Sequence, residues 1–481
     1  MRAALLALLP LVMIPPAAAQ APWAVPVAPP AGYDRAAAQA QTLARLQALV
    51  RIDTRNPPGN ELQAARWFDS VFAGVAGVER HVLEAGDGRA NFIARLRATR
   101  PTARPVIVMG HMDVVGADSA RWLSGPLDPV VREGYLYGRG TIDDKGMLAA
   151  ATTAVLLLAT RRDQLDRDII LVATAGEEGG PPVGVDRVVS AHRELLGDAE
   201  FALNEGGRIR VAGNRIRTVN IQTTEKVPYS LVLRAEGPSG HGSVPLPGNA
   251  LAALARAAAR LHDWRPPVRL NETTRLYFSR LAAIEAEPAM RAAMEAVARP
   301  GATPAEVTAA AEVLSREPLH NAVLRAGLSL TLMNGGIRSN VIPAEGTATF
   351  NLRVLPDEDL PSLLAEIRRV AGEPQVTLTL DRGPEPAPVP SPVSTALFQA
   401  MESAATAMAP GAVVIPFLST GATDGAVLRA QGIPTYGILP FPLAMEDELR
   451  MHGDNERVPL PALGWATEFL YRVLLAVSGP R

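Results

Sequence analysis

The stretch Tyr137-Gly138-Arg139-Gly140-Thr141-Ile142-Asp143-Asp144-Lys145-Gly146 leads into an apolar run at 147–158 that is predicted to be a helix. Its three glycines free the backbone for tight turns. They leave one carboxylate, that of Asp143, at the entrance of the helix. Taken alone, such an acid is as often a turn residue as a ligand. Its role therefore depends on what the rest of the chain brings beside it.

The composition bounds the class of protein. At 481 residues the chain is too long for one core, so we expect at least two globular units. The formal net charge of −2 provides no basic field to collect phosphates, which argues against nucleic acid or an anionic membrane as the main partner. There is no cysteine, which excludes disulfides, thiolate ligands and a cysteine nucleophile. A metal site must use His, Asp and Glu, which favours zinc, manganese or cobalt.

Residues 1–19 have the three-part pattern of a secretory signal peptide: a charge, an apolar run at 3–14 and a small-residue cleavage site. The apolar run is too short to span a bilayer and contains Pro10, so we expect cleavage after Ala19 rather than a stable membrane anchor. Residues 20–33, rich in Pro and Ala, are then a linker. Export without cysteine suits a bacterial periplasm, where we expect the chain to be located.

Strands alternate with helices over residues 34–215, which predicts a doubly wound, mostly parallel α/β sheet as the first part of a catalytic domain. From about residue 215 the pattern changes to alternating β-branched residues at 218–234, which favours antiparallel strands. We therefore expect a smaller α+β lid domain, of the dimerisation type, inserted at 216–384. It includes a long helical segment at 271–324. The second part of the catalytic domain is predicted at 385–481, after a proline-rich linker at 384–392.

Five acidic or histidine side chains come directly after three predicted strands. They are His111 and Asp113 after the strand at 106–109, Glu177 and Glu178 after the strand at 169–173, and Glu205 after the strand at 201–203. The carboxyl ends of parallel strands meet at one edge of a sheet, where converging loops build sites on a rigid support. The sequence therefore predicts that these side chains lie close together.

Six short motifs follow one another along nearly the whole mature chain. They are Asn56-Pro57-Pro58-Gly59, Gly110-His111-Met112-Asp113-Val114-Val115, Gly138-Arg139-Gly140-Thr141-Ile142-Asp143-Asp144-Lys145-Gly146, Gly176-Glu177-Glu178-Gly179, Asn204-Glu205-Gly206 and His452-Gly453-Asp454-Asn455-Glu456. In this order and spacing they resemble the M20 metallopeptidase clan, which includes carboxypeptidase G2-like, aminoacylase-like and succinyl-diaminopimelate desuccinylase-like hydrolases. Each fragment alone is weak, whereas the set is specific.

The resemblance implies that Asp143 bridges two zinc ions, with cobalt or manganese as alternatives. His111 and Glu205 then complete the protein ligands of one ion, and Glu178 and His452 those of the other. Two divalent ions bring four positive charges, and the three carboxylates with a bridging hydroxide bring four negative ones. Such matching lets a buried cluster exist without a large desolvation cost. The resemblance also implies a cis peptide bond between Asp143 and Asp144.

Asp113 and Glu177 bind no metal in this assignment. Asp113, two residues beyond His111, is suited to accept the proton of the imidazole nitrogen that does not bind metal. Glu177, beside Glu178, is the expected general base. It would take a proton from metal-bound water and then protonate the leaving amine.

Three lid residues resemble the family's substrate-binding positions. His241, in the glycine-rich loop 237–243, resembles the histidine that stabilises the oxyanion of the tetrahedral intermediate. Asn340 and Arg353 match positions that grip the substrate, and Arg353 suits a bidentate carboxylate clamp. The loop 421–425 resembles a further segment that lines the pocket. Many relatives dimerise through the lid, sometimes lending the lid histidine to the neighbouring site, so the expected protein partner is a second copy.

We therefore expect a zinc-dependent hydrolase that cleaves an amide bond of small peptides or N-acyl amino acids, with carboxypeptidase action ranked first. N-acyl-amino-acid hydrolysis is the enzymatic alternative, because the segment 271–324 resembles the carboxypeptidase S and N-fatty-acyl-amino-acid hydrolase branch. A periplasmic peptide- or metal-binding protein is the alternative outside enzymes. Glu177 favours the enzyme, since binding alone needs no unliganded carboxylate beside the ligands.

Overall fold

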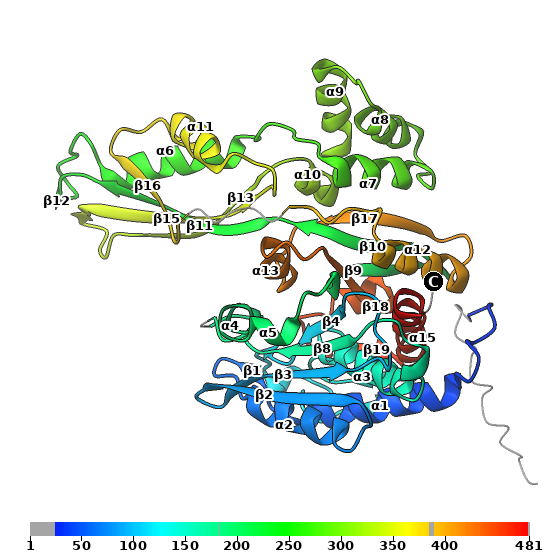
Figure 1. Cartoon of the computed structure of the whole chain (residues 1–481). Helices are drawn as coiled ribbons and strands as arrows, with labels where there is room; N and C mark the ends of the chain where they lie inside the picture. The colour runs from blue at the N-terminus through cyan, green and yellow to red at the C-terminus, as the bar shows by residue number, and fades with distance from the viewer. Residues whose placement is uncertain (1–24, 181, 384–388, 480–481) are drawn as a thin grey trace, which may run out of the picture.

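The computed structural model describes residues 25–180, 182–383 and 389–479. The predicted signal peptide at 1–19, residues 20–24 of the predicted linker and residues 384–388 of the proline-rich linker lie outside these ranges. The described residues form two main sheets of different size, each with its own helices (Figure 1), and three small sheets of two or three strands.

The larger sheet has eight strands in the order β17-β10-β18-β9-β4-β8-β3-β2. Their bounds are β2 Val78–Gly86, β3 Arg89–Leu96, β4 Val106–His111, β8 Ile169–Thr174, β9 Phe201–Ala212, β10 Arg215–Glu225, β17 Val413–Ser419 and β18 Thr435–Ala444. Strand β4 runs parallel to both β8 and β9, and the pairs β18–β9 and β17–β10 are also parallel. The predicted fold class, a mostly parallel α/β sheet, is confirmed.

Helices cover both faces of this sheet. Their bounds are α1 Arg35–Arg51, α2 Glu61–Phe72, α3 Lys145–Ala159, α12 Ala396–Met408 and α15 Leu460–Ser478 on one face, and α4 Val185–Ala191, α5 Arg193–Leu196 and α13 Gly425–Ala430 on the other. Strand β4 shows the alternation that this layering requires, because Val106 and Val108 enter the larger core and Ile107 and Met109 the smaller one. Helix α15 is long and apolar enough to cross a membrane, yet 67% of it is buried inside the protein as a core helix.

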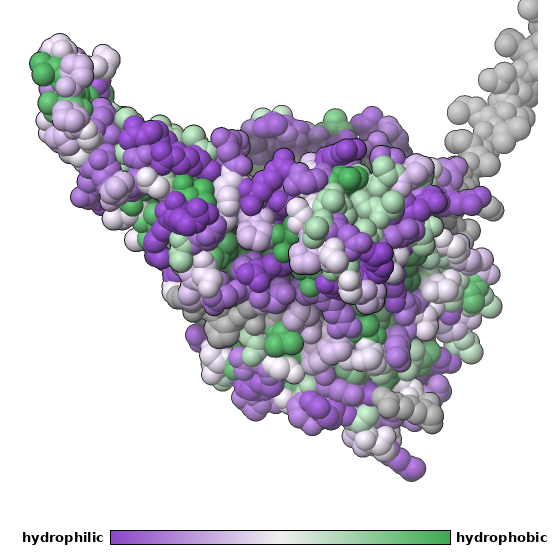
Figure 2. All heavy atoms as spheres, turned by 90° about the horizontal axis from the view of Figure 1, so that it is seen from above, coloured by the Kyte–Doolittle hydropathy of each residue, from purple (hydrophilic) through white to green (hydrophobic). Residues whose placement is uncertain are grey.

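The smaller sheet, here called the lid sheet, has four antiparallel strands in the order β13-β15-β11-β16. Their bounds are β11 Val227–Glu236, β13 Gly327–Gly335, β15 Glu345–Val354 and β16 Val376–Leu380, with helices α6 Ala250–Asp263 and α11 Leu360–Ala371 packed against them. Two short strands, β12 Gly240–His241 and β14 Val341–Ile342, pair at its outer end. Seen from above, the lid extends beyond the body as an arm (Figure 2).

The predicted boundary at residue 216 differs from the structure by one strand. Strand β10 lies in the large sheet between β17 and β18, and only β11 belongs to the lid sheet. A single residue, Lys226, separates β10 from β11. The alternating pattern at 218–234 therefore continues from one sheet into the other without a break that the sequence could reveal.

The helical segment at 271–324 is a separate packing unit. It consists of α7 Glu272–Ala282, α8 Pro288–Ala298, α9 Pro304–Leu314 and α10 Pro318–Leu324. Its core includes Ile415 and Leu418 of β17, so it covers the edge strand of the large sheet. Strand β13, at the edge of the lid sheet, keeps Leu330, Leu332 and Met333 exposed.

The remaining elements are short and lie around the body. They are β1 Arg55–Asn56, β5 Val114–Val115, β6 Val130–Arg132, β7 Tyr135–Tyr137, β19 Arg457–Pro459, α14 Met445–Glu448 and the 3₁₀ helices Ser119–Arg121 and Arg162–Gln164.

The close approach of β9, β10 and β18 leads to a prediction about the stability of the fold. A Cβ atom at Gly207 would overlap the backbone carbonyl oxygens of Asn220 and Gly437. Both carbonyls belong to paired strands, so relieving the overlap would distort the sheet. Gly207→Ala is expected to lower the free energy of unfolding by about 3 kcal/mol in denaturant titrations. Gly116→Ala is the matched control, because a Cβ atom at Gly116 meets nothing within 4 Å. Equal effects of the two substitutions would contradict the steric explanation.

Candidate metal centre

Asp143 lies between β7 and α3, in the glycine-rich loop that the sequence singled out. The loop is tight, since a Cβ atom at Gly146 would overlap the carbonyl of Thr141. The peptide bond between Asp143 and Asp144 is cis, which confirms the geometry that the family resemblance implied. The Asp143 carboxylate thus emerges at the start of α3, towards the carboxyl ends of β4 and β8.

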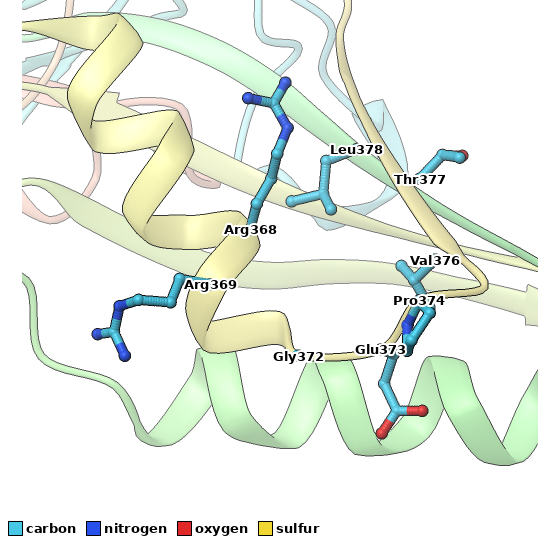
Figure 3. A pocket seen from close by; sticks show the side chains of 8 residues that line it. All are labelled: Arg368, Arg369, Gly372, Glu373, Pro374, Val376, Thr377 and Leu378. Atoms are coloured by element: carbon cyan, nitrogen blue, oxygen red, sulfur yellow. The ribbon is translucent and has the colours of Figure 1, made fainter.

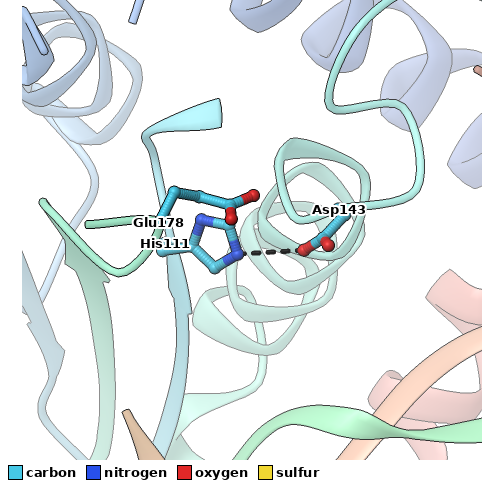
Figure 4. Close-up of side chains that lie close together, drawn as sticks. All are labelled: His111, Asp143 and Glu178. Atoms are coloured by element: carbon cyan, nitrogen blue, oxygen red, sulfur yellow. Dashed lines mark hydrogen bonds and ion pairs between the residues drawn. The ribbon is translucent and has the colours of Figure 1, made fainter. Parts of the chain in front are cut away.

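The structure brings together four of the five predicted ligands through direct contacts. Ligand atoms of His111, Asp143 and Glu178 all lie within 4.8 Å of one another (Figure 4). The Nε2 atom of His111 lies 3.0 Å from Oδ1 of Asp143. The Nε2 atom of His452 lies 3.2 Å from Oδ2 of Asp143 and 3.0 Å from Oε1 of Glu178. The two oxygens of Asp143 therefore face different imidazoles, as a bridging ligand requires.

Glu205, the fifth predicted ligand, lies on β9 and is 7% exposed. Burial and then the negative charge of Asp143 raise the pKa of Glu205 to about 8. The charge of Arg208, a neighbour that the sequence did not single out, acts in the opposite direction. The shift indicates that Glu205 and Asp143 are crowded together in a poorly solvated site.

The donor set fits two divalent cations. It combines three carboxylates with two imidazoles and contains no sulfur, the ligand types that suit zinc, manganese or cobalt. Hydrogen bonds with Asp143 and Glu178 raise the pKa of His452 to about 10. Positive charge is thus stabilised at the position where the Nε2 atom meets two carboxylates, and a bound cation would supply that charge with the imidazole neutral.

Asp113 holds the ligand loops in place. Its backbone carbonyl lies 2.9 Å from Nδ1 of His111, whereas its carboxylate Oδ1 is 3.6 Å from that nitrogen. The carboxylate instead accepts the backbone N–H groups of Glu177 and Glu178, at 3.1 and 3.0 Å, and the side-chain amide of Asn56 at 2.9 Å. The predicted contact with the second imidazole nitrogen is therefore made more closely by the main chain of Asp113 than by its side chain.

Glu177 lines a cleft of about 770 Å³ between the body and the base of the lid. Its pKa is raised well above the ordinary value, by burial first and then by the charges of Glu205, Asp424 and Glu178. Asp424 comes from the predicted pocket loop 421–425 and accepts a hydrogen bond from Thr174 at 2.6 Å. Lys226 and Pro228, at the start of the lid sheet, line the same cleft.

The three predicted lid residues lie at opposite ends of the lid sheet. Arg353 on β15 pairs with Pro228, next to the cleft, and its side chain is half-buried. His241 is exposed and contacts Ser243, and Gly242 beside it donates to the carbonyl of Asn340. The eight residue steps from Arg353 to Glu345 alone span about 26 Å of strand. One chain therefore does not bring His241 and Asn340 to Arg353.

A second hollow, of about 650 Å³, lies on the lid between α11 and β16 (Figure 3). Its acid, Glu373, is paired with Arg256 and Arg260, and its Arg369 is paired with Glu366. It contains none of the predicted site residues, so the cleft beside Glu177 remains the candidate substrate site.

Sequence reasoning gave no role to two residues in contact with the ligand loops. Asn56 and Glu456 both belong to the quoted motifs, yet the motifs alone do not show what each side chain contacts. Asn56 links Asp113 to the carbonyl of Gly179, and Glu456 accepts N–H groups next to Asp143. Each also has a backbone partner, and hydrogen bonds to the backbone leave no pattern in a sequence.

Comparisons with a family model and with curated proteins agree on one family. The model of peptidase family M20/M25/M40 matches residues 107–476. The N-fatty-acyl-amino acid synthase/hydrolase PM20D1 of Homo sapiens is 26% identical over 393 residues, which is 79% of this chain and 75% of the relative. The probable carboxypeptidase S-like 2 of Dictyostelium discoideum is 27% identical, covering 77% and 71%. Aminoacylase-1 of Mus musculus is 26% identical, covering 75% and 76%.

Solved structures share the fold. An M20 family metallo-carboxypeptidase from Sulfolobus solfataricus superposes with a TM-score of 0.65 at 18% identity, covering 90% of this chain and 98% of that one. A Bacillus subtilis protein described as a dinuclear metal binding peptidase of the M20 family gives a TM-score of 0.58 at 13% identity, covering 92% and 99%.

The ligand geometry predicts that metal binding stabilises the fold. Zn²⁺ added to metal-stripped protein is expected to stabilise it by about 2.7 kcal/mol at a free concentration one hundred times the dissociation constant. Asp143→Ala removes the carboxylate that faces both imidazoles and should abolish this gain, whereas Asp163→Ala, an exposed control, should keep it. Thermal unfolding with and without Zn²⁺ measures both. A full gain in Asp143→Ala would exclude Asp143 as a ligand.

Proposed function

The chain belongs to peptidase family M20/M25/M40, and we propose that it is a two-zinc hydrolase that cleaves an amide bond of small peptides or N-acyl amino acids. One observation carries the proposal: Glu177 lines a cleft beside four converging candidate ligand side chains, and its carboxylate makes no hydrogen bond to any of the four. The relatives named as a carboxypeptidase, an aminoacylase and an N-fatty-acyl-amino acid hydrolase support the substrate class.

The candidate ligands would hold the two ions as the family resemblance implied. Asp143 would be shared by both ions, His111 and Glu205 would hold one of them, and Glu178 and His452 would hold the other. Bound there, two divalent ions supply a Lewis acid for the substrate carbonyl and lower the pKa of water. The dinuclear site described for the Bacillus subtilis relative supports this count.

Glu177 performs the proton transfers. The backbone N–H of Glu177 donates to the Asp113 carboxylate, which anchors the main chain of Glu177 beside the cleft that this residue lines. Burial and then the neighbouring carboxylates raise the pKa of Glu177 above its ordinary value, which makes its carboxylate a stronger proton acceptor. Glu177 takes a proton from the attacking water and gives it to the leaving amine.

Arg353 and the base of the lid favour a carboxypeptidase. The Arg353 side chain makes one hydrogen bond, to Asn351, and Lys226 is fully buried beside the cleft. Burial lowers the pKa of Lys226 to about 7, with the charge of Arg353 adding to the shift. A substrate carboxylate bound beside the Arg353 guanidinium would be matched by the positive charge of that side chain. Hydrolysis of N-acyl amino acids uses the same carboxylate and remains the alternative substrate class.

The proposal includes a dimer in which the outer end of one lid completes the site of the partner. His241 and Asn340 lie together at that end, away from the cleft of their own chain. The exposed apolar residues of the edge strand β13 supply a surface for a second copy. His241 would then stabilise the oxyanion in the partner's site, and Asn340 would hold its substrate.

We also propose a periplasmic location. The support is the signal-like pattern of residues 1–19 and the absence of cysteine from the chain.

Glu177→Gln tests the assignment of the general base. We expect it to lower kcat by about a thousandfold while metal content, measured by elemental analysis, stays at the wild-type level. Asp186→Asn, which alters another carboxyl group lining the cleft, is the control and should keep most of the activity. The substrates are a panel of dipeptides and N-acyl amino acids, with and without chelator. If the wild type shows no chelator-sensitive turnover on any of these substrates, the result favours the hypothesis of a binding protein over that of an enzyme.

A mixed dimer tests the sharing of His241. Glu177→Gln and His241→Ala chains are co-expressed with different affinity tags and purified through both tags. In the shared arrangement one of the two sites contains both Glu177 and His241, so about half of the wild-type activity returns. Each variant alone should be nearly inactive. A mixed dimer no more active than the variants would place His241 in the site of its own chain, or outside any site.

A further inference from the structure

Glu456 is a buried carboxylate whose hydrogen bonds converge on the loop that carries Asp143. One oxygen accepts the backbone N–H groups of Ile142 and Asp143, at 2.7 and 3.2 Å. The other accepts the backbone N–H of Gly140 at 3.0 Å and the Arg139 guanidinium at 2.7 Å. Glu456 has no exposed surface, so these four donors are what keeps its charge in the protein interior.

The same residue belongs to the loop that carries His452. Arg139 also donates to the carbonyl of Gly453 at 2.8 Å, and the backbone N–H of Gly138 donates to the carbonyl of Glu456 at 3.0 Å. The two loops are therefore joined by side-chain and main-chain hydrogen bonds. Asp143 and His452, four residues before Glu456, meet across this joint at 3.2 Å.

We propose that Glu456 is the positioning residue of the metal centre, and that it sets the distance between Asp143 and His452 by holding their two loops in one arrangement. The inference rests on the proposed function, because it concerns the same metal site. Glu456 touches neither metal nor substrate. Its effect passes through the backbone of residues 140–143 and through Arg139.

The chemistry of the acceptor explains why a carboxylate is needed. Each oxygen of Glu456 accepts two donors, and all four donors come from the Asp143 loop. A glutamine in the same place would turn an NH₂ group towards one pair, so two donors would face a donor. The loop would have to move to relieve that contact, and the Asp143 carboxylate would move with it.

Glu456→Gln is therefore expected to weaken Zn²⁺ binding by about 10- to 100-fold, the range found for residues that orient metal ligands. The measurement is competition with a chromophoric chelator on metal-stripped protein. At saturating Zn²⁺, kcat should fall while KM changes less than threefold, because the substrate site in the cleft is untouched. The matched control is Glu468→Gln, which alters a buried carboxylate held by Arg35 and Arg472 on α1 and α15. It should bind Zn²⁺ within twofold of the wild type.

The outcomes separate this inference from the proposed function. If the wild type binds no Zn²⁺, the metal centre itself is wrong. If the wild type binds two ions and Glu456→Gln binds them equally well, only the positioning role is wrong. An equal loss of affinity in Glu468→Gln would also overturn it, since the effect would then follow from any buried charge. Should Glu456→Gln fail to fold, Arg139→Lys tests the same joint and is expected to weaken binding at least threefold with an unfolding midpoint near the wild type.

Discussion

The structure depends on one electrostatic constraint, the crowding of Asp143, Glu178 and Glu205 in one poorly solvated site. Three such charges repel one another strongly, and only opposite charge held at fixed distances makes the arrangement stable. The two imidazoles provide part of it, at 3.0 to 3.2 Å from carboxylate oxygens. Two divalent ions would supply the rest. The large sheet serves this cluster, because its parallel strands end at one edge and hold the ligand loops rigidly.

A second set of carboxylates fixes the ligand loops without binding metal. Asp113 accepts the N–H groups of Glu177 and Glu178, and Asp144 accepts the N–H of His111. Glu456 accepts the N–H of Asp143. Three ligand-bearing segments are thus each tied to a buried acid by the backbone. Because these acids accept main-chain hydrogen bonds, the side chains of the candidate ligands stay free to face the proposed ions, which gives the buried acids beside them a structural role.

The sequence predicts which side chains converge more completely than it predicts the sheet. Strands such as β4 and β8 are short, apolar and β-branched, and they carry His111 and Glu178 at or just after their carboxyl ends. Glu205 instead lies within β9, which continues from the predicted strand at 201–203 to Ala212. Strand β18 lies in the middle of the sheet, yet it contains Pro440 and Pro442, which normally exclude a central strand. The pairing of β18 with β9 shifts register at Gly437/Leu439 and Leu439/Pro442, and these irregularities accommodate the prolines. Such shifts depend on the neighbouring strand and leave no local pattern.

The length of the lid sheet decides whether one chain can complete the substrate site. Arg353 lies at the base of the lid, whereas His241 and Asn340 lie beyond the far end of β15, at least about 26 Å away along the strand. A two-residue substrate spans about 7 Å. Rotation of the lid about the junction at Lys226 would move the outer end of the lid relative to the body. It would not change the distance between Arg353 and His241, because both lie on one rigid lid. One small substrate therefore cannot contact Arg353 and His241 of the same lid, and this distance is the reason for proposing that the outer end of the lid completes the site of a second copy.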